Sequence, residues 1–135
     1  MGKSLHPLDV ASLCASYLYA LPGRTTHPSV VYFTALAHHL ERRRPGQRAR
    51  HIGYLSALRA TGMDVRLGRF KAKTLTCPLC GRRFTRFEEK ETDVALGVQL
   101  VESALLGAFD TLVPLSGDSD LVPALAAALP FGRAS

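Results

Sequence analysis

Segments with the spacing of helices alternate along this chain with short apolar runs that are typical of strands. Helical spacing covers residues 7–21, 47–60, a long stretch that ends near residue 107, and 121–129. Runs rich in β-branched and aromatic residues predict strands over 29–34, 63–67 and 111–115. Because helices that connect parallel strands cover both faces of the sheet, this order predicts an α/β domain with a small parallel sheet flanked by helices.

Local patterns add detail to this outline. Thr85 and Glu88 have the spacing of a capping box, which would open the long helix. Residues 38–50 are polar and basic and contain a Pro-Gly pair, so we expect a mobile loop there. Residues 71–87 read as a basic insertion around a Cys-x-x-Cys motif. One face of the long helix is predicted to carry four apolar residues: Val94, Val98, Val101 and Leu105.

The charge of the chain is concentrated in its middle. Of the 17 Lys and Arg residues, 14 lie between residues 41 and 90, whereas residues 91–135 hold 6 of the 11 Asp and Glu residues. A basic surface favours a polyanion such as RNA. The alternative is an ordinary solvated face. The residues expected to bind phosphate are Arg42, Arg43, Arg44, Arg48, Arg50, Lys71, Lys73, Arg82, Arg83 and Arg86.

Hydropathy and cysteine content indicate where in the cell the protein is expected. No run approaches the roughly 20 apolar residues that a membrane span needs. Three cysteines, two of them in a Cys-x-x-Cys motif, do not form a disulfide framework. We therefore expect a cytoplasmic protein without a membrane partner.

Two aspartates, Asp118 and Asp120, follow the last predicted strand in a Ser-Gly-Asp-Ser-Asp loop. Ligands of doubly wound folds bind beyond the carboxyl ends of strands, so this loop stands where a site would be. Both carboxylates can approach one hard cation such as Mg²⁺ or Mn²⁺. The alternative is that Asp120 only caps the helix that starts at Leu121.

A third carboxylate, Asp93, lies in the first turn of the long predicted helix. The helix dipole alone would favour an acidic residue there. Glu89 and Asp93 are four residues apart, so on a helix they would face the same way and repel each other unless a cation lies near them. Lys90 could relieve this repulsion or reach a phosphate oxygen.

The order and spacing of these motifs resemble the NYN family of PIN-like ribonucleases. The family has an E-K-x-x-D-V helix, a Y/F-D pair before the next strand, and an S-x-D-S-D-L loop after it. The matching residues are Glu89-Lys90-Glu91-Thr92-Asp93-Val94, Phe109-Asp110 and Ser116-Gly117-Asp118-Ser119-Asp120-Leu121. Upstream segments also resemble the family's elements in order. The resemblance implies one three-layer PIN-like domain over residues 1–135.

The resemblance also implies a metal-dependent ribonuclease that hydrolyses RNA phosphodiester bonds. Asp93, Asp118 and Asp120 would be the catalytic residues and would hold Mg²⁺ or Mn²⁺, which activates a water and offsets charge on the leaving oxygen. Four residues would be auxiliary, the two serines by shaping the loop or touching phosphate: Glu89, Lys90, Ser116 and Ser119.

One part of the family pattern is not found. Family members open with a strand that ends in D-G-x-N, and residues 1–20 contain no such motif. We therefore expect the first strand of the family to be missing and the chain as written to be a poor nuclease or none. The unpaired edge of the sheet would favour a homodimer. The alternative function is that of a catalytically inactive RNA-binding or protein-binding domain.

The Cys77-Pro-Leu-Cys80-Gly81 segment resembles half of a zinc knuckle. Two thiolates at this spacing can hold one tetrahedral Zn²⁺, which requires four ligands. Cys14 or one of the five histidines could complete the set, although none has a ligand spacing. A redox-active pair, or one without a ligand, is the alternative.

Overall fold

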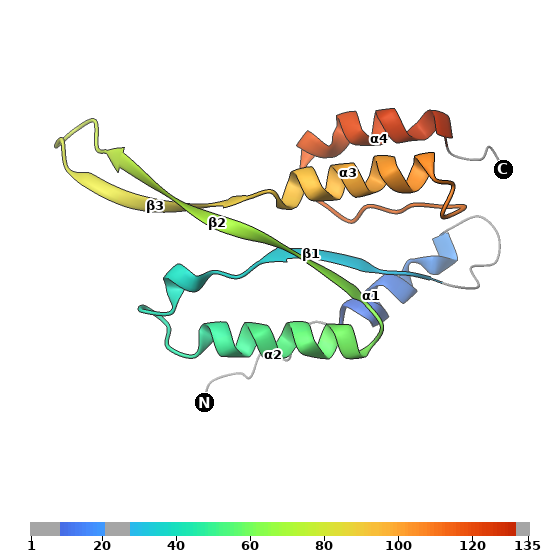
Figure 1. Cartoon of the computed structure of the whole chain (residues 1–135), viewed down its shortest axis with the longest axis horizontal. Helices are drawn as coiled ribbons and strands as arrows, with labels where there is room; N and C mark the ends of the chain where they lie inside the picture. The colour runs from blue at the N-terminus through green and yellow to red at the C-terminus, as the bar shows by residue number, and fades with distance from the viewer. Residues whose placement is uncertain (1–8, 21–27, 132–135) are drawn as a thin grey trace. The chain divides into compact units, whose positions relative to one another are not determined.

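The computed structural model describes residues 9–20 and 28–131 as two compact units, residues 1–67 and 68–135. The Pro22-Gly23 pair after the helix predicted over 7–21, together with His6 and His27, lies outside the described residues. The main elements are α1 (Val10–Ser16), β1 (Val31–Ala35), α2 (Gln47–Ala60), β2 (Asp64–Thr76), β3 (Arg83–Lys90), α3 (Thr92–Leu105) and α4 (Val122–Ala128) (Figure 1). Short 3-10 helices are η1 (Leu18–Ala20), η2 (His38–Leu40), η3 (Ser119–Leu121) and η4 (Leu129–Phe131).

The first unit is built around the apolar face of α2. Leu55 and Leu58 are buried on this helix, whereas Ile52 on the predicted stripe is 41% exposed. Asp9 caps α1 because its carboxylate accepts the backbone N–H of Ser12 at 3.0 Å. The core cluster of this unit consists of Val10, Leu55, Leu58, Met63 and Val65.

The segment before α2 is ordered by one carboxylate. Glu41 accepts the backbone N–H groups of Gly46 at 2.7 Å and Arg48 at 3.0 Å, so it satisfies donors at the start of the helix. The N–H groups of Arg48 and Gly46 hold the pKa of Glu41 below its usual value. The prediction of a loop over 38–50 is therefore wrong for η2 and for residues 47–50, which form the first turn of α2, whereas residues 41–46 form hydrogen-bonded turns.

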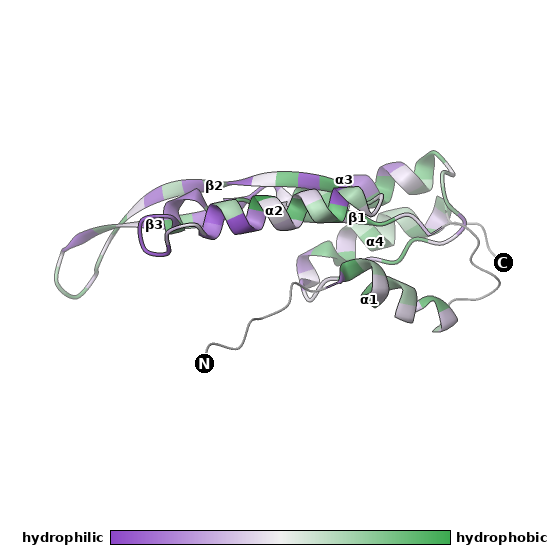
Figure 2. Ribbon diagram, turned by 90° about the horizontal axis from the view of Figure 1, so that it is seen from below, coloured by the Kyte–Doolittle hydropathy of each residue, from purple (hydrophilic) through white to green (hydrophobic). Residues whose placement is uncertain are grey.

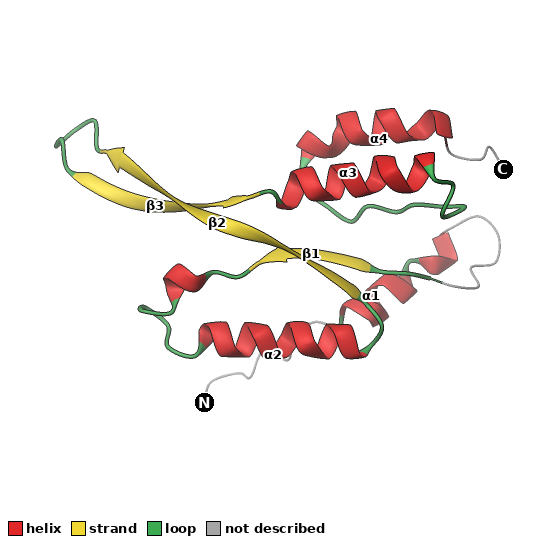
Figure 3. Ribbon diagram, in the orientation of Figure 1, coloured by secondary structure: helices red, strands yellow, loops and turns green. Residues whose placement is uncertain are grey.

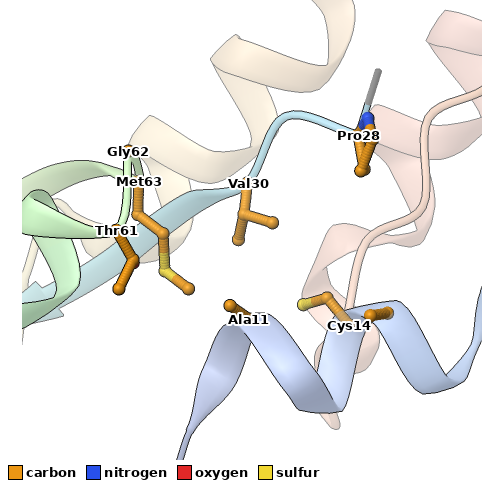
Figure 4. A pocket seen from close by; sticks show the side chains of 8 residues that line it. Ala11, Cys14, Pro28, Val30, Thr61, Gly62 and Met63 are labelled. Carbon is orange, nitrogen blue, oxygen red and sulfur yellow. The ribbon is translucent and has the colours of Figure 1, made fainter. Parts of the chain in front are cut away.

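A small hollow in the first unit is lined mostly by apolar side chains (Figure 4). It measures about 290 Å³ and lies between α1 and the segments that lead into β1 and β2. Ala11, Val30 and Met63 line it, with the thiol of Cys14 and the side chain of Thr61. Because no charged side chain of the described residues lines it, we interpret this hollow as a packing feature.

The sheet has the order β1–β2–β3, and the division between the two units falls inside β2, after Leu67. Strands β2 and β3 pair in antiparallel register from Arg69 with Lys90 to Thr76 with Arg83. The sheet is therefore mixed, and the prediction of a purely parallel sheet is wrong in this respect. The predicted basic insertion at about 71–87 forms most of this hairpin.

The predicted capping box is wrong because strand β3 lies where the long helix was expected to start. Thr85 and Glu88 lie in β3 and pair across the hairpin, so they form no capping box. Helix α3 begins at Thr92, after Glu91 in a left-handed conformation with φ of 78°. Glu91 alone separates the strand from the helix, which places Asp93 in the first turn of α3 directly after the strand.

Helices α3 and α4 pack against each other in the second unit. Gly97 lies against α4, since a Cβ placed on it would be 3.3 Å from the Cβ of Ala124. Leu100 and Leu121 are buried here, whereas Val94 is 71% and Val98 59% exposed. The prediction that Val94, Val98, Val101 and Leu105 share one face of the helix is confirmed, since all four line one hollow, although Val94, Val98 and Leu105 are exposed.

The segment between α3 and α4 contains no strand over residues 106–118 (Figure 3). The strand predicted over 111–115 is wrong. Pro114 has no N–H to donate to a neighbouring strand, and the apolar residues Val113 and Leu115 are exposed here. The acidic loop is therefore positioned by the start of η3 and not by the end of a strand.

Gly68 allows β2 to pass close to the junction of β3 and α3. A Cβ at this position would lie 2.4 Å from Oγ1 of Thr92 and 2.8 Å from the carbonyl oxygen of Lys90. We expect Gly68→Ala to lower the free energy of unfolding by about 1–3 kcal/mol, because the backbone must move to admit the methyl group. Urea denaturation followed by circular dichroism measures this loss.

Gly53 provides the matched control for this substitution. It lies inside α2, and no atom is within 4 Å of the position of an added Cβ. Gly53→Ala should raise the free energy of unfolding by about 0.5–1 kcal/mol, since alanine is the better helix former. Equal effects of the two substitutions would contradict the close approach at Gly68.

Candidate functional site

Asp93 and Asp120 line the same hollow in the second unit. Helices α3 and α4 lie side by side and run in the same direction, and both begin at the end next to β3 (Figure 1). Since Gly97 faces Ala124, the positions about one turn earlier, Asp93 and Asp120, lie at the same level of the two helices. The hollow measures about 900 Å³. Its acidic end is therefore formed by two helix starts.

The remainder of this hollow is mostly apolar. Val94, Val98 and Leu105 of α3 line it opposite Leu121 and Pro123 of the α4 side. Both carboxylates are themselves exposed, so a cation bound there would keep part of its water shell.

Asp118 has a structural role that is visible in its contacts. Its Oδ1 accepts the backbone N–H of Asp120 at 2.9 Å, so Asp118 caps η3. Its own backbone N–H donates to Oγ of Ser116 at 3.1 Å. Ser116 therefore shapes the loop, and Ser119 is the first residue of η3. Asp118 does not line the hollow that Asp93 and Asp120 share.

Glu89 and Lys90 lie at the end of β3 and not on a helix. The predicted helical pairing of Glu89 with Asp93 is therefore wrong. Glu89 instead accepts a hydrogen bond from Oγ1 of Thr92 at 2.6 Å, at the start of α3. Lys90 pairs with Glu88, with 3.0 Å between Nζ and Oε2. Both residues thus help to fix the junction that presents Asp93.

The donor set determines which cation could bind. Among the described residues, no three His, Cys, Asp or Glu side chains are gathered so that they could hold a metal ion. Mg²⁺ commonly keeps several waters and takes one or two carboxylates together with substrate phosphates. The pair Asp93 and Asp120 fits such a hydrated ion, and it does not fit a cage made of protein ligands alone.

One face of the β2–β3 hairpin is strongly basic. Side chains alternate between the two faces of a strand, and the register places Lys71 opposite Glu88 and Lys73 opposite Arg86. Five cations and one carboxylate give this face a net charge of +4. We call it the basic face; it consists of Arg69, Lys71, Lys73, Leu75, Phe84, Arg86, Glu88 and Lys90.

The charges of the basic face are not balanced within the hairpin. Lys73 and Arg86 stand directly opposite each other, a like-charge pair that destabilises a sheet. Glu88 lies 3.8 Å from Nζ of Lys73 and also pairs with Lys90, so one carboxylate serves two lysines. Lys90 and then Lys73 hold the pKa of Glu88 below its usual value. The excess positive charge suits a polyanion.

Sequence reasoning missed two residues of this face, Arg69 and Phe84, whereas Lys90 was predicted to relieve a repulsion or reach a phosphate oxygen. Phe84 is 49% exposed among the cations, where its ring could stack on a nucleic-acid base. The mixed colours of the hairpin in Figure 2 reflect this alternation of hydrophilic and hydrophobic residues. A two-residue period over 69–76 and 83–90 was the signal that could have found them.

The other predicted phosphate-binding residues lie elsewhere. Arg83 is on the opposite face of the hairpin from Arg86, and Arg82 lies in its turn. Five exposed arginines belong to the first unit, before and in the first turn of α2: Arg42, Arg43, Arg44, Arg48 and Arg50.

Cys77 and Cys80 lie at the tip of the hairpin. The backbone N–H of Cys77 donates to the carbonyl of Arg82, and that of Gly81 donates to the carbonyl of Cys77, both at 2.9 Å. Backbone N–H groups of Cys80 and Leu79 also donate to the sulfur of Cys77 and lower the pKa of its thiol. Cys14, Cys77 and Cys80 form no disulfide.

An α/β fold of this kind, with carboxylates at the starts of neighbouring helices, is that of a PIN-like domain. The family model of the NYN domain matches residues 19–133. The chain therefore belongs to the NYN domain family, which confirms the resemblance of its motifs. The match begins after α1, so the resemblance of residues 8–14 stays a prediction. No curated protein and no solved structure shows significant similarity to the chain.

Membership places the chain in a PIN-like nuclease family, whose domains generally bind RNA and usually use a divalent metal. Within the described ranges, no helix combines the length and the apolar character that crossing a bilayer demands.

Proposed function

We propose that this protein is a metal-dependent ribonuclease that hydrolyses RNA phosphodiester bonds at the hollow between α3 and α4. The observation that carries the proposal is the position of Asp93 and Asp120 at the same level of two neighbouring helix starts, on one hollow. They are also two of the acidic positions that the resemblance to the family motifs implies. The preferred ion is Mg²⁺ or Mn²⁺, because carboxylate oxygens are the ligands that these hard cations favour.

Asp93 and Asp120 would hold the ion, which activates a water and offsets charge on the leaving oxygen. Asp118 keeps the backbone of Asp120 in place through its capping hydrogen bond. Its second carboxylate oxygen, Oδ2, is the atom that could assist at the site. Glu89 and Thr92 fix the start of α3, so that Asp93 is oriented before substrate binds.

The basic face of the hairpin would hold the RNA. It belongs to the same unit as the acidic hollow, and β3 leads into α3 through Glu91 alone. Phosphate groups would lie along the lysines and arginines, while Phe84 offers a stacking surface to an unpaired base. We accordingly propose single-stranded RNA as the substrate class.

A second candidate function is RNA binding without cleavage. Two observations favour it: the unbalanced charge of the basic face, and the lack of a group of three metal-binding side chains among the described residues. A fluorescent single-stranded RNA distinguishes the two functions when it is incubated with Mn²⁺ or with EDTA. Cleavage that requires Mn²⁺ supports the nuclease. Tight binding without cleavage under any metal supports the second function.

The basic face predicts a defined loss of RNA affinity. The double variant Lys73→Gln, Arg86→Gln should weaken binding of single-stranded RNA. It should also reduce the slope of log K against log salt by about 1.4, because each phosphate contact contributes about 0.7. Fluorescence anisotropy at several salt concentrations measures both quantities.

Arg83→Gln is the control for this variant, since it removes a charge from the opposite face of the same hairpin. It should leave the slope nearly unchanged. If Arg83→Gln reduces the slope as much per charge as the double variant does, the hairpin binds RNA through its general charge and not through the basic face.

A further inference from the structure

The tip of the β2–β3 hairpin has the form of a zinc knuckle. Cys77 directly follows β2, and the turn Pro78 to Gly81 returns the chain so that Cys80 lies close to Cys77. Backbone N–H groups of Leu79 and Cys80 point at the sulfur of Cys77. Gly81 has a φ of 67°, which a side chain would strain. The backbone therefore presents two sulfur atoms to one side before any ion is bound.

This half-site is incomplete within the described chain. A structural Zn²⁺ takes four ligands in tetrahedral geometry. No third His, Cys, Asp or Glu stands with Cys77 and Cys80 among the residues that the structure describes. Cys80 is exposed, and so is Leu79 between the two cysteines, at 95%. The tip projects away from the helices of its own unit, so a second molecule can reach it (Figure 1).

We propose that two copies of this chain are joined at their hairpin tips by one Zn²⁺ ion, which Cys77 and Cys80 of each copy coordinate. Two identical half-sites related by a two-fold axis supply the four thiolates of a tetrahedral site. The two exposed Leu79 side chains lie beside the ion and can cover each other in the dimer.

The charge around the hairpin tip favours a second copy of the chain that binds through a shared Zn²⁺ ion. Four thiols lose four protons to the solvent when they bind Zn²⁺, so the centre carries a charge of −2. Arg82 and Arg83 directly follow the knuckle in each copy, and without the ion two such basic tips would repel each other. The anionic centre offsets these arginines. We therefore expect the dimer to form only when zinc is bound.

The test uses the full chain, purified under reducing conditions. Zinc content is measured by elemental analysis and molar mass by light scattering after size exclusion. We expect about one zinc per two chains and the mass of a dimer, and EDTA should return the protein to monomers. Co²⁺ in place of zinc should give the intense visible absorption of a tetrahedral thiolate site.

Matched variants distinguish the shared zinc site from a disulfide-linked dimer and from a zinc site within one chain. Cys77→Ser and Cys80→Ser should each abolish both the zinc and the dimer, with the far-UV circular dichroism of the native chain retained. Cys14→Ser should keep both, because Cys14 lies in the apolar hollow of the first unit. Three results would overturn the proposal: one zinc per monomer, a zinc-free dimer that reductant dissociates, or a native chain that stays monomeric with zinc present.

Discussion

Replacing either aspartate of the acidic hollow should nearly abolish cleavage. We expect Asp93→Asn and Asp120→Asn each to lower the Mn²⁺-dependent rate of RNA cleavage by a factor on the order of 10³, because each removes a charged oxygen that would hold the ion. RNA affinity measured with Ca²⁺ or EDTA should change little, since the basic face is intact. The initial rate on a fluorescent single-stranded RNA measures the effect.

Asp64→Asn is the control, as it removes an exposed carboxylate that pairs with Arg66 in the first unit. It should retain the wild-type rate, because an exposed ion pair contributes little to stability. Wild-type cleavage that survives Asp93→Asn and Asp120→Asn would contradict the proposed site and would point to another nuclease in the preparation.

Asp118 can be tested separately as a cap and as a metal ligand. Asparagine caps a helix about as well as aspartate, because it keeps the side-chain oxygen that accepts the N–H of Asp120. Asp118→Asn therefore removes the charge and keeps the cap, whereas Asp118→Ala removes both. If Asp118 assists at the ion, Asp118→Asn loses activity as Asp120→Asn does. If it only orders the loop, Asp118→Asn stays active and Asp118→Ala does not.

The largest expected loss of stability comes from the core of the first unit. Leu55 is 2% exposed and belongs to the cluster of buried side chains around α2. Leu55→Ala should lower the free energy of unfolding by about 2–5 kcal/mol, through lost burial and the cavity left behind. The midpoint of urea denaturation reports this change.

Ile52→Ala on the same helix is the control for Leu55→Ala. Ile52 is 41% exposed, so its truncation should cost clearly less. Similar losses for the two variants would contradict the described orientation of α2.

The sequence predicted those parts of the fold that depend on local spacing. The predicted helix 47–60 coincides with α2, since the period of Ile52, Leu55 and Leu58 is helical and a glycine follows its end. The position of Asp93 in the first turn of a long helix was also correct. Both features are determined by residues that lie within a few positions of each other in the sequence.

The parts that failed depend on pairing between distant residues. Strands β2 and β3 are rich in charge, and a basic segment was interpreted as an insertion because no buried face reveals its alternation. Only the register shows that Lys73 and Arg86 stand opposite each other. The apolar run over 111–115 has the composition of a strand, but a strand also needs a partner, which composition cannot supply.

The direct passage from β3 into α3 has a consequence for where RNA would be cut. The eight residues of β3 span about 26 Å at the usual rise of about 3.3 Å per residue, and only Glu91 separates this strand from the helix that carries Asp93. Strand and acidic residue therefore share one stiff piece of backbone. RNA bound along β3 would therefore be cut at a fixed number of nucleotides from the end that β3 binds, whatever its base sequence.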